Sequence, residues 1–222
     1  MSPVRPGEPT GLPVDARPDD VVWPAMVWPV PAGTELVGPV VRLRVVDPEV
    51  DAPGLFAALD DDRVWAHLTG RPADPDALAG TLRDRADRLG WHQWVVRDSV
   101  TGAVLGTSSY LEVSPGDARL EVGATGYSPA VWASAVNPAA KLLLLGLAFD
   151  QLRTGRVQLK TDVRNVRSQR AIARLGASCE GVLRRYQRRA DGTVLHTVVF
   201  SVTAEQWPVV RSGLLARLGT GR

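Results

Sequence analysis

Four polar residues stand at positions where their side chains could do chemistry. Asn165, Ser168 and Arg170 open a short helix-like stretch that follows a strand-like one. An amide, a hydroxyl and a guanidinium placed there can hydrogen-bond a polar ligand, although Asn165 could equally be the N-cap of the helix and Ser168 could face solvent. Glu121 stands among apolar residues in LEVG, where a carboxylate can act as a general base. It could instead face solvent or pair with an arginine.

The hydrophobic pattern predicts the elements that must position these residues. Alternation and turn signals predict strands at 40–46, 91–97, 103–113, 118–128, 156–163, 179–188 and 193–203, with Asp191-Gly192 as the last hairpin turn. Helical spacing predicts one or two short helices within 53–68, and helices at 75–90, 137–152 and 166–175, the last ended by Gly176 in the left-handed conformation. This order predicts an α+β (mixed α/β) sheet flanked by helices in one domain.

Composition predicts a soluble, cytoplasmic protein. Cys179 is the one cysteine among 222 residues, so no intrachain disulfide can form. The apolar runs are shorter than a membrane span, and the first residues lack the pattern of a signal peptide. We expect residues 1–20 to be poorly ordered and 21–39 to lie extended on the body. Residues 40–208 should form the domain, and 209–222 should end the chain as a helix or tail.

The order of elements, with these residues at the joints, resembles the GNAT superfamily of acyl-CoA-dependent N-acyltransferases. Within it the chain resembles the branch of ribosomal-protein alanine N-acetyltransferases. The motifs that carry the resemblance are Leu120-Glu121-Val122-Gly123, Val136-Asn137-Pro138-Ala139-Ala140-Lys141, Asn165-x-x-Ser168-x-Arg170-Ala171, Glu180-Gly181-Val182-Leu183-Arg184 and Glu205-x-Trp207-Pro208. The resemblance covers 40–208 and implies a twisted, mostly antiparallel sheet of about seven strands, splayed between its fourth and fifth strands.

The resemblance also implies acetyl-CoA as co-substrate. The pantetheine arm would lie in the splay like an added strand, with its pyrophosphate at the helix start after residue 135. The cofactor-binding residues would be Val122, Gly123, Trp132, Ala133, Ser134, Ala135, Val136, Asn137, Asn165, Ser168 and Arg170. Ala133 and Ala135 stand where relatives often have glycine. Alanine keeps its N–H group, so anion binding survives if the backbone is not left-handed there.

For catalysis, the resemblance implies direct attack of a primary amine on the thioester in a ternary complex. Glu121 would take the proton of the amine, and Ser168 or water would protonate the leaving thiolate. The acceptor pocket would be lined by Trp65, His67, Trp91 and His92. Three histidines and one cysteine without metal-ligand spacing argue against a metal site. The acceptor (a protein N-terminus or a small-molecule amine), the length of the acyl group and a homodimer stay open.

Two other functions also stay open. A domain of this kind without its loop glycines could bind CoA without turnover. The segment 151–190 has eleven Lys or Arg against two acids, a balance that would suit nucleic acid. That segment lacks the interleaved aromatic residues typical of such binding, so nucleic acid is the least favoured partner. No membrane partner is expected.

Overall fold

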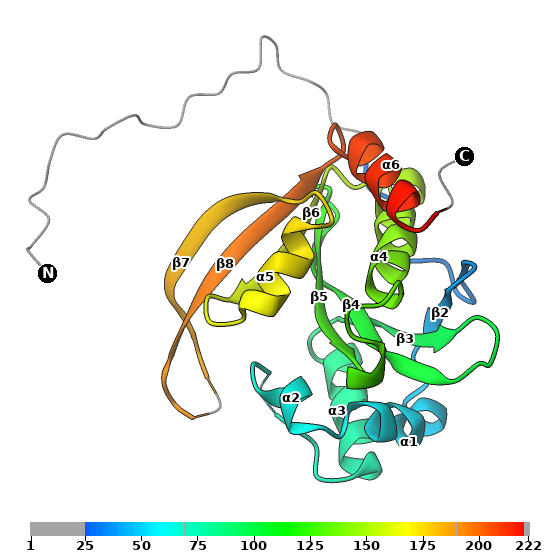
Figure 1. Cartoon of the computed structure of the whole chain (residues 1–222), viewed down its shortest axis with the longest axis vertical. Helices are drawn as coiled ribbons and strands as arrows, with labels where there is room; N and C mark the ends of the chain where they lie inside the picture. Colours follow the sequence, from blue (N-terminus) through cyan, green and yellow to red (C-terminus); the bar gives the residue numbers. More distant parts are fainter. Residues whose placement is uncertain (1–24, 69, 190, 220–222) are drawn as a thin grey trace, which may run out of the picture.

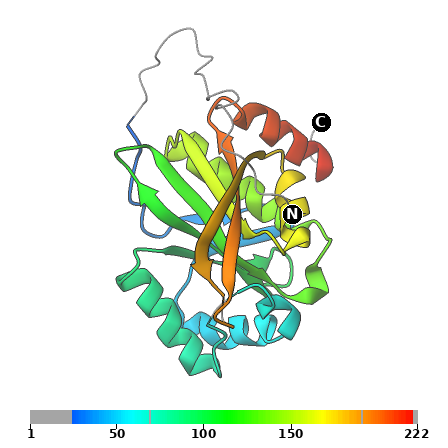
Figure 2. The same cartoon turned by 90° about the vertical axis from the view of Figure 1, so that its left-hand side faces the viewer.

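The computed structural model describes residues 25–68, 70–189 and 191–219, which form one open sheet with helices on both faces (Figures 1 and 2). The predicted segment 1–20 lies outside the described residues. Eight strands form the sheet in the order β1-β2-β3-β4-β5-β6-β8-β7. Neighbouring strands are antiparallel except β5 and β6, which are parallel. The mixed α/β architecture predicted from the sequence is confirmed.

Seven of the eight strands lie where alternation predicts them. The strands are β1 (Glu35–Val37), β2 (Val41–Val45), β3 (His92–Asp98), β4 (Val104–Ser114), β5 (Arg119–Tyr127), β6 (Arg156–Asp162), β7 (Ser178–Arg188) and β8 (Val194–Thr203). The additional strand is β1, a three-residue edge strand inside the proline-rich segment. Three residues are too few to show an alternating pattern, so the sequence did not reveal it.

The helices are α1 (Pro48–Leu59), α2 (Asp62–Trp65), α3 (Pro75–Asp87), α4 (Val136–Gly146), α5 (Val166–Ala173) and α6 (Trp207–Arg217). Helix α1 begins before the predicted residue 53 because the side chain of Asp47 accepts hydrogen bonds from the Glu49 and Val50 N–H groups. The predicted helix 137–152 is divided, since a π-helical turn (Leu147–Gln151) follows α4. Gly176 has a φ of +94°, as predicted for the residue that ends α5.

Two hydrophobic layers hold the helices against the sheet. On one face, Leu144 of α4, Ile172 of α5 and Leu214 of α6 share a core with Trp94 and Val96 of β3. On the other face, residues of α1, α2 and α3 pack against Val95. Successive side chains of a strand point to opposite faces, so β3 contributes to both layers. Figure 1 shows α1–α3 gathered at one end of the sheet and α4 beside α6.

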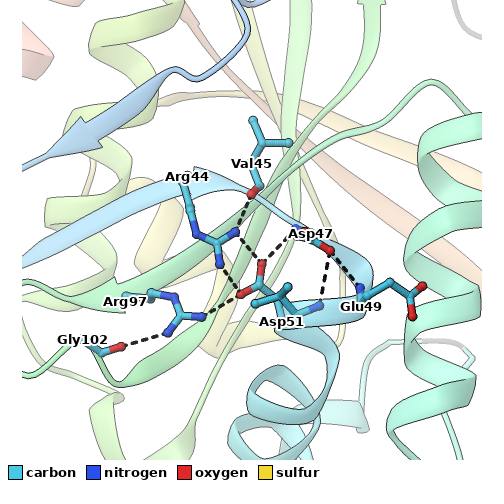
Figure 3. Close-up of polar contacts among 8 residues, drawn as sticks. Arg44, Val45, Asp47, Glu49, Asp51, Arg97 and Gly102 are labelled. Atoms are coloured by element: carbon cyan, nitrogen blue, oxygen red, sulfur yellow. Dashed lines mark hydrogen bonds and ion pairs between the residues drawn. The ribbon is translucent and has the colours of Figure 1, made fainter.

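A buried carboxylate fixes α1 to the sheet (Figure 3). Asp51 is 0% exposed, and its two oxygens accept hydrogen bonds from Arg44 at 2.7 and 2.8 Å. Arg97 of β3 donates a further bond of 2.7 Å, and the Asp47 N–H donates one of 2.9 Å. A buried carboxylate is stable only when it is paired and hydrogen-bonded in this way. The cluster therefore sets the position of α1 over β2 and β3.

Candidate active site

The sheet opens between β5 and β6. These two strands pair only over Arg119–Glu121 and Arg156–Gln158, and beyond Glu121 no ladder joins them. A bulge lies in the separated part of β5: Thr107 pairs with Gly126 and Ser109 with Gly123, so β5 carries one extra residue. Ala124, at the bulge, has a φ of +46°. A cleft of about 1000 Å³ occupies this opening.

One end of the cleft is the start of α4. Trp132, Ala133, Ser134 and Asn137 line it, whereas Ala135 and Val136 are not part of its wall. The N-cap residue Ala135 has no side chain that could cap α4, the Ser134 Oγ accepts a hydrogen bond of 3.2 Å from the Val136 N–H, and the first turn contains no acid. A helix start of this kind attracts an anion because its N–H groups and dipole point outward. Ala135 has a right-handed φ of −71°, but Ala133 is left-handed with a φ of +60°.

Two arginines flank an indole beside this helix start. The guanidinium carbon of Arg167 lies 3.4 Å from the centroid of Trp132, and that of Arg63 lies 5.6 Å from it. Burial, together with the nearby charge of Arg63, lowers the pKa of Arg167. Arg170, which the sequence favoured for this position, is exposed and lies outside the wall of the cleft. Arg167, three residues earlier on α5, lines the cleft and places a positive charge there.

Asn165 and Ser168 both line the cleft. The Ser168 N–H donates to Asn165 Oδ1 at 3.0 Å, so Asn165 is the N-cap of α5. Within the described residues, neither the Asn165 Nδ2 nor the Ser168 Oγ makes a hydrogen bond to protein. Capping uses only the amide oxygen, which leaves the NH₂ group available to a ligand.

Glu121 lies in the wall of the cleft and is 5% exposed. Its Oε2 is 2.8 Å from Lys160 Nζ, which also contacts Glu112 at 2.7 Å. Burial raises the pKa of Glu121, while Lys160 opposes the rise. A carboxylate with a raised pKa is a better proton acceptor. A Cβ atom on Gly123 would lie 2.6 Å from Glu121 Oε1, so glycine at that position leaves room for the carboxylate.

Three of the four residues expected around the acceptor line the cleft: Trp65, His67 and Trp91. Arg85 stacks on Trp91 with its guanidinium carbon 5.0 Å from the ring centroid. His92 does not line the cleft. It lies in an aromatic cluster, 4.8 Å from Trp94 between ring centroids, because alternation along β3 puts both on one face.

The sequence reasoning missed two lysines of the site. Lys141, on α4, is 4% exposed and lines the cleft. Its Nζ donates to Ser108 Oγ at 3.0 Å and to Thr125 Oγ1 at 2.7 Å. Burial lowers the pKa of Lys141 to about 7, against the opposing charge of Glu121. Lys160 is the other. The signal for Lys141 was present, since it is a single charge within the apolar stretch PAAKLLLLG.

Comparison with known proteins decides the family. Residues 41–178 match the model of the acetyltransferase (GNAT) domain. The chain belongs to the GNAT acetyltransferase family. A solved structure from T. thermophilus, described as an acetyltransferase, is 38% identical over 86% of this chain and 100% of its own, with a TM-score of 0.77. Another structure described as an acetyltransferase is 37% identical over 88% of this chain and 100% of its own, with a TM-score of 0.78.

The ribosomal-protein branch of the GNAT family shares the fold. The ribosomal-protein-S5-alanine acetyltransferase from Vibrio fischeri is 17% identical over 78% of this chain and 98% of its own, with a TM-score of 0.65. No curated protein matches the sequence. Among the described residues, no cluster of His, Cys, Asp or Glu is placed to hold a metal ion, and no helix is both long and apolar enough to cross a membrane.

Proposed function

We propose that the protein transfers the acetyl group of acetyl-CoA to a primary amine, by direct attack in a ternary complex. One observation carries the proposal: the unpaired edge of β5, the acid-free start of α4 and the buried carboxylate of Glu121 line a single cleft. Each of these three features suits one part of the reaction. The strand edge would bind the pantetheine arm of the donor, the start of α4 would bind its phosphates, and the carboxylate would accept a proton.

The cleft fits the shape and charge of acetyl-CoA. From Val122 to Tyr127, β5 offers about 20 Å of strand edge without a partner on the β6 side. An extended chain of amides, such as pantetheine, can hydrogen-bond such an edge as a strand would. The pyrophosphate would meet the N–H groups at the start of α4, with Arg167 nearby. Asn165 Nδ2 would donate to the arm from the β6 side.

The chemistry then needs a base, a donor for the oxyanion and a group that stabilises the leaving sulfur. Glu121 takes the proton of the attacking amine. A backbone N–H at the bulge between Gly123 and Gly126 stabilises the negative charge that develops on the carbonyl oxygen. Ser168 lines the cleft with a hydroxyl that no group of the described chain engages, and can bond the sulfur. The aromatic residues Trp65 and Trp91 in the wall of the cleft would contact the acceptor.

Release of free thiol from acetyl-CoA tests the proposal. The purified protein would be mixed with acetyl-CoA and a panel of peptides with free N-termini, amino acids and polyamines. We expect thiol release that depends on the amine, with an acetylated product in the mass spectrum. Tight binding of acetyl-CoA without amine-dependent release would instead support the second candidate, a CoA-binding domain without turnover, which the left-handed Ala133 favours.

The phosphate position has its own test in Ala135→Asp. Ala135 is the N-cap residue of α4, but its backbone is helical, with φ −71° and ψ −11°, so a side chain there is not placed to cap the helix. The aspartate carboxylate would repel the phosphates at short range. The variant should therefore bind acetyl-CoA at least tenfold more weakly by calorimetry, with its midpoint in urea denaturation little changed. Unchanged affinity would place the phosphates elsewhere.

A further inference from the structure

Lysine is used in this chain at two positions only. Of the 26 Lys and Arg residues, the lysines are Lys141 and Lys160, and both line the cleft. The two differ in their partners. Lys160 is bound to the carboxylates of Glu112 and Glu121, whereas Lys141 has no carboxylate within ion-pair distance among the described residues. A buried lysine without a counter-ion is costly to keep charged. Lys141 is not needed to pair with Glu121, because Lys160 already does so.

The position of Lys141 follows from α4 and the bulge. Ser134, Asn137, Pro138 and Lys141 line the cleft at helical spacing, so this face of α4 leads from the anion-binding start inward. The bulge turns Thr125 to the face on which Ser108 lies, and their hydroxyl oxygens are 2.8 Å apart. These two hydroxyls hold Lys141 Nζ beside the unpaired edge of β5.

Lys141 and Glu121 reach that edge from opposite faces of the sheet. Glu121 pairs with Leu111 and lies between Leu120 and Val122, which face the core under α4. Alternation therefore directs Glu121 away from α4, the helix that carries Lys141. A tetrahedral intermediate holds its nitrogen and its sulfur at different corners. A base on one face and an acid on the other could serve both atoms at once.

We propose that Lys141 is the general acid of acyl transfer, which donates a proton from Nζ to the sulfur that leaves the acyl carbon. This inference rests on the proposed function. The amine nitrogen forms a bond to the carbonyl carbon, the carbon–sulfur bond breaks, and the electron pair of that bond goes to sulfur. Glu121 gains the proton of the amine, and Lys141 loses one to sulfur. Exchange with solvent returns both groups to their starting states.

The electrostatics of the cleft suit an acid at this position. Burial lowers the pKa of Lys141 to about 7 and raises the pKa of Glu121, so both values move toward neutral pH, where a general acid and a general base work best. A thiol titrates near 8.5, so transfer from Lys141 to a thiolate is downhill. Among the carboxylates, Glu121 is the one whose charge acts on Lys141. The other charged or titratable groups in the wall are His67 after α2, Arg85 on α3, Glu112 on β4, Tyr127 on β5, Lys160 and Asp162 on β6, Arg167 and Arg174 on or next to α5, Arg188 on β7 and Arg217 on α6.

A direct titration tests the state of Lys141 without turnover. Protein labelled with ¹³C at the lysine Cε carbons gives two signals, because the chain has two lysines. Lys141→Arg assigns them by removing one. We expect the chemical shift of the Lys141 signal to titrate with a midpoint near pH 7. The chemical shift of the Lys160 signal should not change up to pH 10, because that ammonium group stays charged. A Lys141 midpoint near the ordinary value of about 10.4 would overturn the proposal.

The pH profile of kcat tests the acid itself, measured with saturating acetyl-CoA and amine. An acid is needed in its protonated form, so wild-type kcat should fall as pH rises through the pKa of Lys141. Lys141→Met should lose that descending limb and lower kcat by about 10²–10⁴-fold at pH 6, with the Kd for acetyl-CoA changed less than threefold. Lys141→Arg should also lose the limb, since guanidinium does not deprotonate near neutral pH.

Two outcomes would separate the two proposals. A descending limb that persists in both variants, or a rise in KM with kcat unchanged, overturns the acid and leaves the acetyltransferase intact. Absence of wild-type thiol release with every amine overturns the acetyltransferase and, with it, the acid. If Lys141→Met fails to fold, Lys141→Arg and the titration still decide the question.

Discussion

Replacing Lys141 with methionine should change how the stability of the protein depends on pH. The pKa of Lys141 falls from 10.5 when exposed to about 7 in the folded protein. A group whose pKa is lower in the folded state destabilises it as pH falls from the higher value to the lower one. At 1.36 kcal/mol per pH unit, the full cost of charging Lys141 in the fold is about 5 kcal/mol, reached below pH 7.

The measurable part of this cost lies between pH 9 and pH 6. Linkage gives a loss of about 3 kcal/mol from the free energy of unfolding across that interval, from Lys141 alone. Methionine has nearly the same length and no charge, and the Ser108–Thr125 hydrogen bond of 2.8 Å can remain in the variant. All other titrating groups are common to both proteins. The difference between variant and wild type should therefore grow by about 3 kcal/mol from pH 9 to pH 6.

Urea denaturation at four pH values measures this difference. The absolute offset between the two proteins depends on packing of the methionine and on two lost hydrogen bonds, each worth about 1 kcal/mol. The change of the offset with pH does not depend on those terms. Parallel stability curves for the two proteins would refute the reasoning, because they would mean that Lys141 is charged equally easily in the folded and unfolded states.

Three further predictions concern the remaining site residues. Glu121→Gln should lower kcat by about 10²–10⁴-fold at pH 7, and the loss should shrink at high pH, where the free amine is abundant; an equal loss at all pH values would indicate a structural role. Asn165→Ser keeps an oxygen that can cap α5 but removes the amide donor, so the KM for acetyl-CoA should rise several-fold with the free energy of unfolding nearly unchanged. Asn165→Ala should raise the KM as well and also lower the free energy of unfolding by about 1 kcal/mol in urea denaturation. A KM equal to that of the wild type in both variants would leave Asn165 as a cap only. Ala133→Gly should leave the free energy of unfolding unchanged or raise it by up to about 1 kcal/mol, while Ala133→Val lowers it by at least about 1 kcal/mol, because the backbone there is left-handed.

The strands and helices were predictable because their signals are local. Alternation in β2–β8 and the turn residues between them lie within windows of about ten residues. The exceptions are elements whose cause is tertiary or very short. Strand β1 is three residues long, and the π-helical turn after α4 belongs to an apolar stretch that looks like continuous helix. The start of α1 was signalled by Asp47, a capping residue before Pro48, and could have been found.

The site was predictable where a motif places several residues together, and not where distant elements meet. Asn165 and Ser168 lie on one turn of helix, so their common position in the cleft followed from their spacing. Lys141 acquires its environment from Ser108 and Thr125, which are 33 and 16 residues away in sequence. No local pattern contains those contacts. His92 was assigned to the cleft because it neighbours Trp91, yet adjacent strand residues point to opposite faces.

Diffraction from crystals soaked with a non-hydrolysable acetyl-CoA analogue tests the central claim most directly. The account predicts the pyrophosphate against the first turn of α4, the pantetheine arm along β5 opposite β6, and the sulfur between Glu121 and Lys141. An analogue bound outside the cleft, or a cleft that stays empty at saturating concentration, would contradict it.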